Sequence, residues 1–111
     1  MKEIKAIIRP TKVDEVIDAI ENLPDSPGLT ISEVQGWGHT RDRKDVRLTR
    51  RVKLEVVVPD EKVEKVLACI EENARTGEGH FGDGIIFVSE VGQTIRIRTG
   101  QRGESVLHPE K

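Results

Sequence analysis

An internal repeat limits the folds that this chain can adopt. The segment IKAIIRPTKVDEVIDAIE begins at Ile4, and LEVVVPDEKVEKVLACIE begins fifty positions later at Leu54, so that the two align without a gap. Each copy opens with alternating apolar residues, which predict a β-strand, and continues with apolar residues at helical spacing, which predict an amphipathic helix. We expect Thr11 and Asp60 to cap these helices. A strand–helix unit therefore occurs twice.

Further strands are predicted after each helix. LTISEVQGWG follows the first helix, and GIIFVSEV and TIRIRTG follow the second. The resulting order, βαββαβ, is that of the ferredoxin-like sandwich, an α+β fold in which two helices cover one face of an antiparallel sheet. A length of 111 residues suits one domain over residues 1–111.

The other face of the predicted sheet carries apolar side chains. Val52, Val57, Ile7 and Ile86 are expected to alternate away from the helices. Apolar surface of this extent is poorly tolerated by a small monomer. The pattern therefore predicts an oligomer packed sheet to sheet.

Composition narrows the classes of function. The chain has 18 basic and 20 acidic residues and only 3% aromatic residues, which argues against a nucleic-acid binder. It has one cysteine and neither a membrane-length apolar run nor a leader segment, so we expect a cytoplasmic protein. No Ser, His and Asp order suggests catalysis, and we expect no enzymatic activity.

Three segments have features of phosphate sites. In TIRIRTG, a strand would place Arg96 and Arg98 on one face about 6 to 7 Å apart, with Ile95 and Ile97 toward the core. Guanidinium groups match phosphate oxygens well. VQGWGHT and TGEGHFGDGIIF are glycine-rich at strand ends, where backbone amides can approach a ligand.

These motifs, together with the opening MKEIKAIIRPTKVDEVIDAI, resemble the PII signal-transduction family, the nitrogen regulatory proteins P-II. The resemblance implies a homotrimer that binds ADP, AMP or ATP between subunits, alone or with Mg²⁺ and without a prosthetic group. It also implies control of a membrane transporter or a metabolic enzyme. The positions that match nucleotide-binding residues of the family are Ile7, Thr30, Gly36, Gly38, Val57, Gly82, Asp83, Gly84, Arg96 and Arg98. Of these, Ile7, Thr30 and Val57 match positions that line the adenine pocket.

The chain departs from the family pattern at four places. The loop after Gly38 is short and has no tyrosine, which excludes uridylylation there. Thr40 replaces the glutamine that helps to hold magnesium and 2-oxoglutarate in the family, which places 2-oxoglutarate sensing in doubt. Ile85 replaces a lysine that reaches the terminal phosphates, so we expect ADP or AMP to be favoured over ATP. Two extra residues, His80 and Phe81, precede the GDG motif.

The segment 39–51, HTRDRKDVRLTRR, is predicted to be a basic, flexible loop that contacts a partner, and 101–111 a C-terminal tail. A solvated loop without a docking role is the plainer interpretation of the same charges. The residues expected to contact a partner are Arg41, Arg43, Lys44, Arg47 and Arg50.

Three alternative interpretations remain open. His39 and His80 lie in loops that converge in a PII-like fold, so a metal-responsive or bicarbonate-responsive regulator linked to a transporter is the second hypothesis. VQGWGHTR is superficially similar to an acylphosphatase signature, but it follows the second strand, whereas that signature follows the first. Nucleic-acid binding would depend on the basic loop alone.

Overall fold

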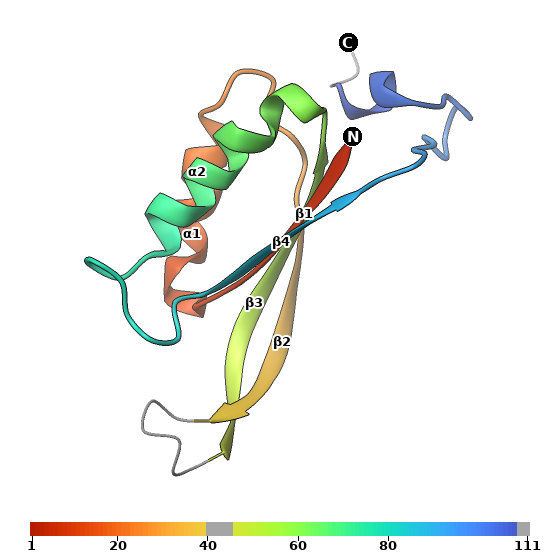
Figure 1. The fold of residues 1–111 in the computed structure, drawn as a ribbon. Coiled ribbons are helices and arrows are strands. Elements are labelled where there is room, and N and C mark those ends of the chain that lie inside the picture. Colours follow the sequence, from red (N-terminus) through yellow and green to blue (C-terminus); the bar gives the residue numbers. More distant parts are fainter. Residues whose placement is uncertain (40–45, 109–111) are drawn as a thin grey trace.

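The predicted ferredoxin-like sandwich is confirmed. A computed structural model describes residues 1–39 and 46–108. Within these residues an antiparallel sheet has the strand order β2-β3-β1-β4, and both helices lie against one of its faces (Figure 1). The elements are β1 (Lys2–Ile8), α1 (Val13–Glu21), β2 (Thr30–His39), β3 (Val46–Val58), α2 (Val63–Ala74) and β4 (Gly84–Glu90).

The two repeats enter their helices in the same way. A short 3₁₀ turn precedes each helix, at Pro10–Lys12 before α1 and at Asp60–Lys62 before α2. Thr11 and Asp60 lie inside these turns, and within the described residues no side chain caps either helix, so the predicted caps are wrong. The Asp60 carboxylate instead accepts a hydrogen bond from the Met1 ammonium at 3.0 Å.

The core lies between the sheet and the helices. Ile4 of β1 stands opposite Val56 of β3 and Val88 of β4, so one face of three strands is apolar. Val16 and Ile20 of α1 are fully buried against this face. The repeat thus supplies both layers of the core, since Leu54, Val56, Val58, Val66 and Ile70 of the second copy are also buried.

The prediction for the open face was partly wrong. Val52 is opposite Ile8, and Ile86 is opposite Ala6, so both side chains point toward the helices. Val52 is only 8% exposed. Ile7 and Val57 do lie on the open face, where Ile85 and Phe87 of β4 join them and are about half exposed. Strand register decides this point, because a shift of one residue exchanges the two faces.

TIRIRTG does not form the predicted strand. Ile95 makes one isolated bridge to Arg102, and Thr99 and Gly100 donate backbone hydrogen bonds to Arg96 O, so the chain turns back on itself. Ile97 is 97% exposed and Ile95 47%, and neither reaches the core. β2 and β4 form the edges of the sheet, and TIRIRTG pairs with neither, because its turn directs its backbone hydrogen bonds to Gln101 and to its own residues.

The hairpin of β2 and β3 projects beyond the rest of the sheet as an arm (Figure 1). The expected loop 39–51 is accordingly shorter than predicted, because His39 ends β2 and residues 46–51 belong to β3. Positions 40–45, with Arg41, Arg43 and Lys44, lie outside the described residues. Among the described tail residues, Glu104–Leu107 form a short 3₁₀ turn.

A candidate anion site at the glycine-rich loop

Asp83 organises the loop between α2 and β4. Its carboxylate accepts hydrogen bonds from the backbone N–H of Thr76 at 3.1 Å and of His80 at 2.8 Å. The third donor is Arg9, whose Nε lies 3.1 Å from Asp83 Oδ1. The loop is therefore closed around one side chain.

These donors favour the ionised carboxylate. The two backbone N–H groups hold the pKa of Asp83 far below its ordinary range, and Arg9 acts in the same direction. The negative charge of Asp83 is thus stabilised by two backbone donors of its own loop and by Arg9. Asp83 therefore holds the conformation of the loop, and an anion would contact the positively charged side chains beside it.

Two glycines of the GDG motif occupy backbone conformations that favour glycine. Gly82 has a φ of 94° and Gly84 a φ of 121°. A methyl group at Gly84 would lie only 2.0 Å from the carbonyl oxygen of Ile7, because β4 begins there against β1. The conformation of the loop and the start of β4 therefore depend on these two residues.

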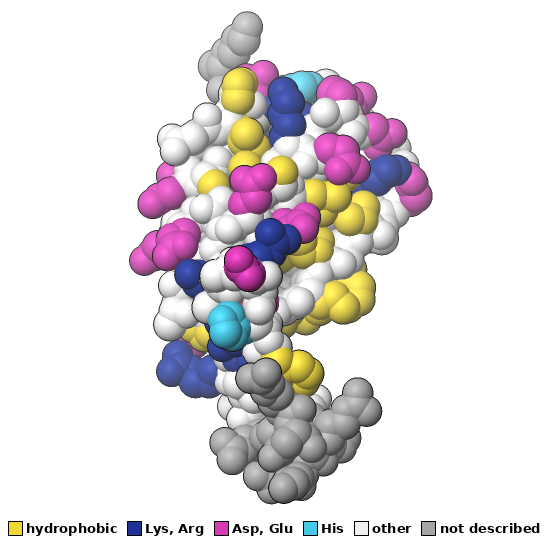
Figure 2. Space-filling view, turned by 60° about the vertical axis from the view of Figure 1, so that its left-hand side comes forward, with side chains coloured by type: hydrophobic (Ala, Val, Ile, Leu, Met, Phe, Trp, Pro, Cys, Tyr) yellow, Lys and Arg dark blue, Asp and Glu magenta, His cyan; other side chains and the backbone are white. Residues whose placement is uncertain are grey.

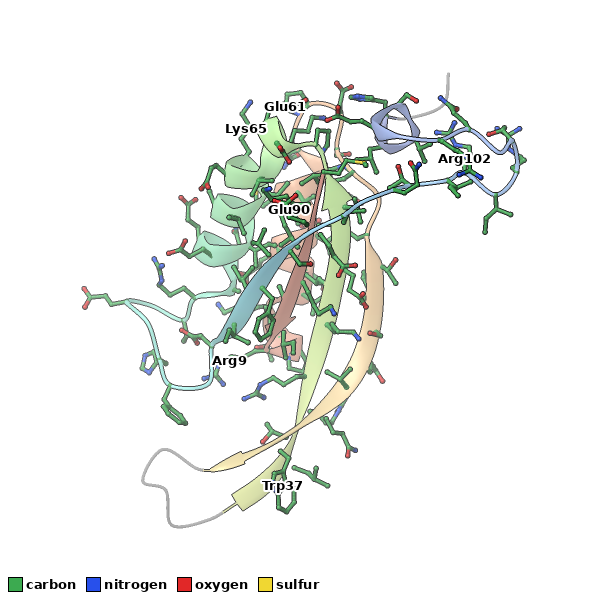
Figure 3. All side chains as sticks on the ribbon, turned by 45° about the vertical axis from the view of Figure 1, so that its right-hand side comes forward. Arg9, Trp37, Glu61, Lys65, Glu90 and Arg102 are labelled. Carbon is green, nitrogen blue, oxygen red and sulfur yellow. The ribbon has the colours of Figure 1, made fainter. Side chains whose placement is uncertain are left out.

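Two arginines that the sequence analysis did not select converge on Gly82. A methyl group at Gly82 would lie 3.1 Å from Arg9 Nη2 and 3.3 Å from Arg51 Nη2. Arg9 follows β1, Arg51 lies in β3, and both stand beside the start of β4, because Ile8 is opposite both Val52 and Gly84. No motif in the sequence signals this meeting, because it depends on the antiparallel register, which places these three chain positions at one end of the sheet (Figure 3 labels Arg9 there).

A shallow hollow of about 360 Å³ adjoins this cluster. It is lined by Arg9, Thr11, Lys12, Thr76, His80 and Phe81. Arg9 Nη2 also donates to Phe81 O at 2.8 Å, which holds the guanidinium at the edge of the hollow. Basic side chains gather toward this end of the molecule in Figure 2, whereas acidic side chains are spread over the remainder of the visible face. The geometry suits a small anion.

The predicted adenine-contacting residues share one face but are not adjacent. Ile7, Thr30 and Val57 all point away from the helices. Ile7 is opposite Lys53, and Val57 is opposite Glu3, so that four strand positions, roughly 13 Å, separate them. Gly36 and Gly38 lie in the arm, opposite Thr49 and Arg47. A single chain does not bring these five residues into one pocket.

Arg96 and Arg98 lie at the opposite end of the sheet from the glycine-rich loop. β4 runs over seven residues between the two regions, which corresponds to roughly 23 Å. Figure 3 shows Arg102, the bridge partner of Ile95, at the far end from Arg9. The prediction that Arg96 and Arg98 reach the phosphates from a neighbouring subunit agrees with this separation and stays a prediction.

The remaining predicted residues divide into two groups. Ile85 is 53% exposed and Arg50 is exposed on the arm, so both are accessible to a ligand or partner. The side chains of His39 and Arg47 are not described.

Among the described residues, no group of three or more His, Cys, Asp or Glu side chains could hold a metal ion, and the metal hypothesis gains no support from that part of the chain. Within the same residues, no helix is long and apolar enough to cross a membrane.

Comparisons with known proteins agree on one family. The family model described as "Nitrogen regulatory protein P-II" matches residues 1–101. The chain is 44% identical over 115 residues to a protein of that name from Nostoc punctiforme, and 42% identical over 115 residues to one from Haemophilus influenzae. In both cases the match covers 96% of this chain and 100% of the relative. "Nitrogen regulatory protein P-II 1" from Methanothermobacter thermautotrophicus is 41% identical, over 96% of this chain and 97% of that protein.

Proposed function

This chain belongs to the nitrogen regulatory protein P-II family, and we propose that it is a non-enzymatic, cytoplasmic sensor of adenine nucleotides. In this proposal the nucleotide phosphates bind at the loop that contains Gly82, Asp83 and Gly84. Nucleotide binding is typical of the family. The bound state is then transmitted to a partner protein.

The convergence of Arg9 and Arg51 on Gly82 is the observation that carries the proposal. Both Nη2 atoms lie within 3.3 Å of the position that a side chain at residue 82 would occupy. A phosphate at the loop would meet two guanidinium groups, and charge-assisted hydrogen bonds of this kind are the stronger ones. Asp83 already neutralises part of the Arg9 charge, so Arg51 is expected to contribute most to anion affinity.

The proposed ligand is ADP or AMP in preference to ATP, bound either alone or together with Mg²⁺. Ile85 offers no charge to a third phosphate. Arg9 and Arg51 partly replace the positive charge of the family lysine that Ile85 replaces. Both guanidinium groups are held near Gly82, because Arg9 also donates to Phe81 O and Arg51 Nη1 donates to Arg50 O at 2.8 Å. Their reach therefore suits the phosphates nearest the loop.

A homotrimer would complete the site. On the open face Ile7 and Val57 are partly buried, Ile85 and Phe87 are exposed, and Ile97 projects almost fully into solvent. Burying these side chains against a neighbouring subunit would stabilise an assembly. It would also allow Arg96 and Arg98 of one subunit to approach the glycine-rich loop of another.

The partner is proposed to be a membrane transporter or a metabolic enzyme with an acidic docking surface. The arm carries Arg47 and Arg50 and leads into a segment with Arg41, Arg43 and Lys44. Positive charge in this segment favours association with an acidic surface. Nucleic acid is not the proposed partner, because the whole chain has two more acidic than basic residues (20 against 18).

Calorimetric titration with ATP, ADP and AMP, with and without Mg²⁺, tests this function. Arg51→Ala is expected to weaken ADP binding by roughly tenfold, the usual scale for loss of one charge-assisted contact. Arg50→Ala is the matched control, because it removes the same charge from the adjacent residue, which points to the other face of β3. Absence of binding to all three nucleotides would refute the proposal. An equal loss of ADP affinity in Arg51→Ala and Arg50→Ala would refute the role of Arg51.

A further inference from the structure

We propose that the C-terminal tail, residues 101–108, is a latch that occupies Arg96 until a nucleotide displaces it. The inference rests on the proposed function, in which Arg96 binds the phosphates of a nucleotide. It adds a regulatory step to that site, because the same guanidinium is engaged by the chain's own tail. Tail and ligand then compete for one side chain.

The contacts of the guanidinium define the latch. Arg96 Nη2 lies 3.1 Å from Val106 O and 3.4 Å from His108 O, and donates to both. Arg96 Nη1 donates to Gln101 Oε1. Three acceptors from one short segment thus surround the end of the Arg96 side chain.

The tail is braced in this position by its own hydrogen bonds. Gln101 Nε2 donates to Ser105 Oγ at 2.9 Å, which links the two sides of the segment. The backbone N–H of Arg96 donates to Gln101 O at 2.8 Å, and Gly103 exchanges hydrogen bonds with Thr94 through its N–H and its carbonyl oxygen. The latch is therefore a folded unit built around Arg96.

The chemistry of the acceptors explains how a nucleotide would open the latch. The three tail acceptors are neutral amide oxygens. Arg96 is ionised in either contact, but a phosphate oxygen also carries the opposite charge and a phosphate can accept a bidentate pair of hydrogen bonds, so it attracts the guanidinium more strongly than a neutral amide oxygen does. A nucleotide would therefore displace the tail, and its apparent affinity would equal its intrinsic affinity multiplied by the fraction of molecules that are unlatched. By reciprocity, ligand binding would release the tail.

Truncation tests the latch directly. The full chain is compared by ADP calorimetry with a variant that ends at Gly103, and with a control that ends at Pro109, which keeps the amide acceptors at Gln101, Val106 and His108. If the latch is closed in about nine-tenths of the molecules, the Gly103 variant binds ADP about tenfold more tightly, and the control binds like the full chain. Hydrogen exchange at the Val106 and His108 amides of the full chain is expected to accelerate when ADP saturates it.

A full-length variant covers the case in which truncation disturbs folding. Gln101→Ala removes one acceptor of Arg96 and the brace to Ser105. It is expected to tighten ADP binding about threefold, which corresponds to the loss of one weak hydrogen bond. Hydrogen exchange at the tail amides is expected to be faster in this variant even without ADP. Equal ADP affinities together with unchanged tail exchange would overturn the latch and leave the proposed function intact. Failure of all the proteins to bind ADP would overturn both.

Discussion

At the scale of single residues, the shape of the candidate site depends on Asp83 and on the glycines beside it. The Asp83 carboxylate ties the backbone at Thr76 and His80 to the guanidinium of Arg9. Gly82 leaves room for Arg9 and Arg51, and Gly84 allows β4 to begin in contact with Ile7. Asp83 and the two glycines thus position Arg9 and Arg51, the residues that we propose to bind an anion.

The low pKa of Asp83 makes stability depend on pH. Because the pKa is lower in the folded chain than in the unfolded chain, the ionised carboxylate stabilises the fold above the unfolded-state value of about 4. This contribution is lost as the pH falls toward the folded-state pKa. Asp83→Asn is therefore expected to melt at a lower temperature at pH 7, and the difference should narrow below about pH 4. Thermal unfolding followed by circular dichroism from pH 7 to pH 2 measures it; a difference independent of pH would contradict the assignment.

Gly84 should tolerate no side chain. Gly84→Ala combines a φ of 121° with a methyl group 2.0 Å from Ile7 O, and we expect it to lower the free energy of unfolding by about 3 kcal/mol or more. Gly28→Ala is the control, because its methyl group would meet nothing within 4 Å, and a change within about 0.5 kcal/mol is expected. Urea denaturation of both variants decides the matter. Equal stabilities would show that β4 can shift away from β1.

At the scale of elements, the arm and the C-terminal segment behave differently from the core. The repeat predicts β1, α1, β3 and α2 well, because each element buries one face and its periodicity records that face. TIRIRTG has the same alternation and yet turns back on itself, with Ile97 in solvent. Alternation shows that a segment has two faces, but a strand forms only where the segment pairs with a neighbour along its length, and TIRIRTG makes a single bridge at Ile95.

The arm should contribute little to the stability of the core. Trp37, the chain's one tryptophan, is 73% exposed beside Leu48 in the arm, whereas Ile20 of α1 is fully buried. Trp37→Ala is expected to change the free energy of unfolding by less than about 1 kcal/mol. Ile20→Ala should cost about 2 to 5 kcal/mol, because it opens a cavity in the core. Urea denaturation compares them, and a larger loss for Trp37→Ala would mean that the arm packs against something in solution.

At the scale of the whole molecule, one chain holds only part of the proposed site. The glycine-rich loop and the segment with Arg96 lie at opposite ends of β4, and the positions predicted to contact adenine are spread over the open face. That face also exposes the apolar side chains of Ile85 and Phe87. Association of several chains would bury this surface and complete the site in one step.

A matched pair of substitutions tests the proposed trimer. Phe87 and Ile31 are similarly exposed, at 51% and 48%, but Phe87 lies on the open face and Ile31 on the helix-covered face. Phe87→Asp would bury a charge at the subunit contact, and we expect it to sediment as a monomer at micromolar concentration. Ile31→Asp is expected to remain a trimer. Sedimentation velocity gives both results, and a monomeric parent protein would refute the trimer itself.

The sequence by itself determined the fold, because the fifty-residue repeat records twice which side of each strand and helix is buried. It also indicated the GDG loop, since glycines at a strand start mark an unusual backbone. Only the tertiary structure decided that Arg9 and Arg51 meet at Gly82 and that Arg96 is held by Val106 and His108. Strand register and the path of the tail bring these residues together. Neither leaves a periodic pattern in the sequence, because both depend on pairing between distant segments.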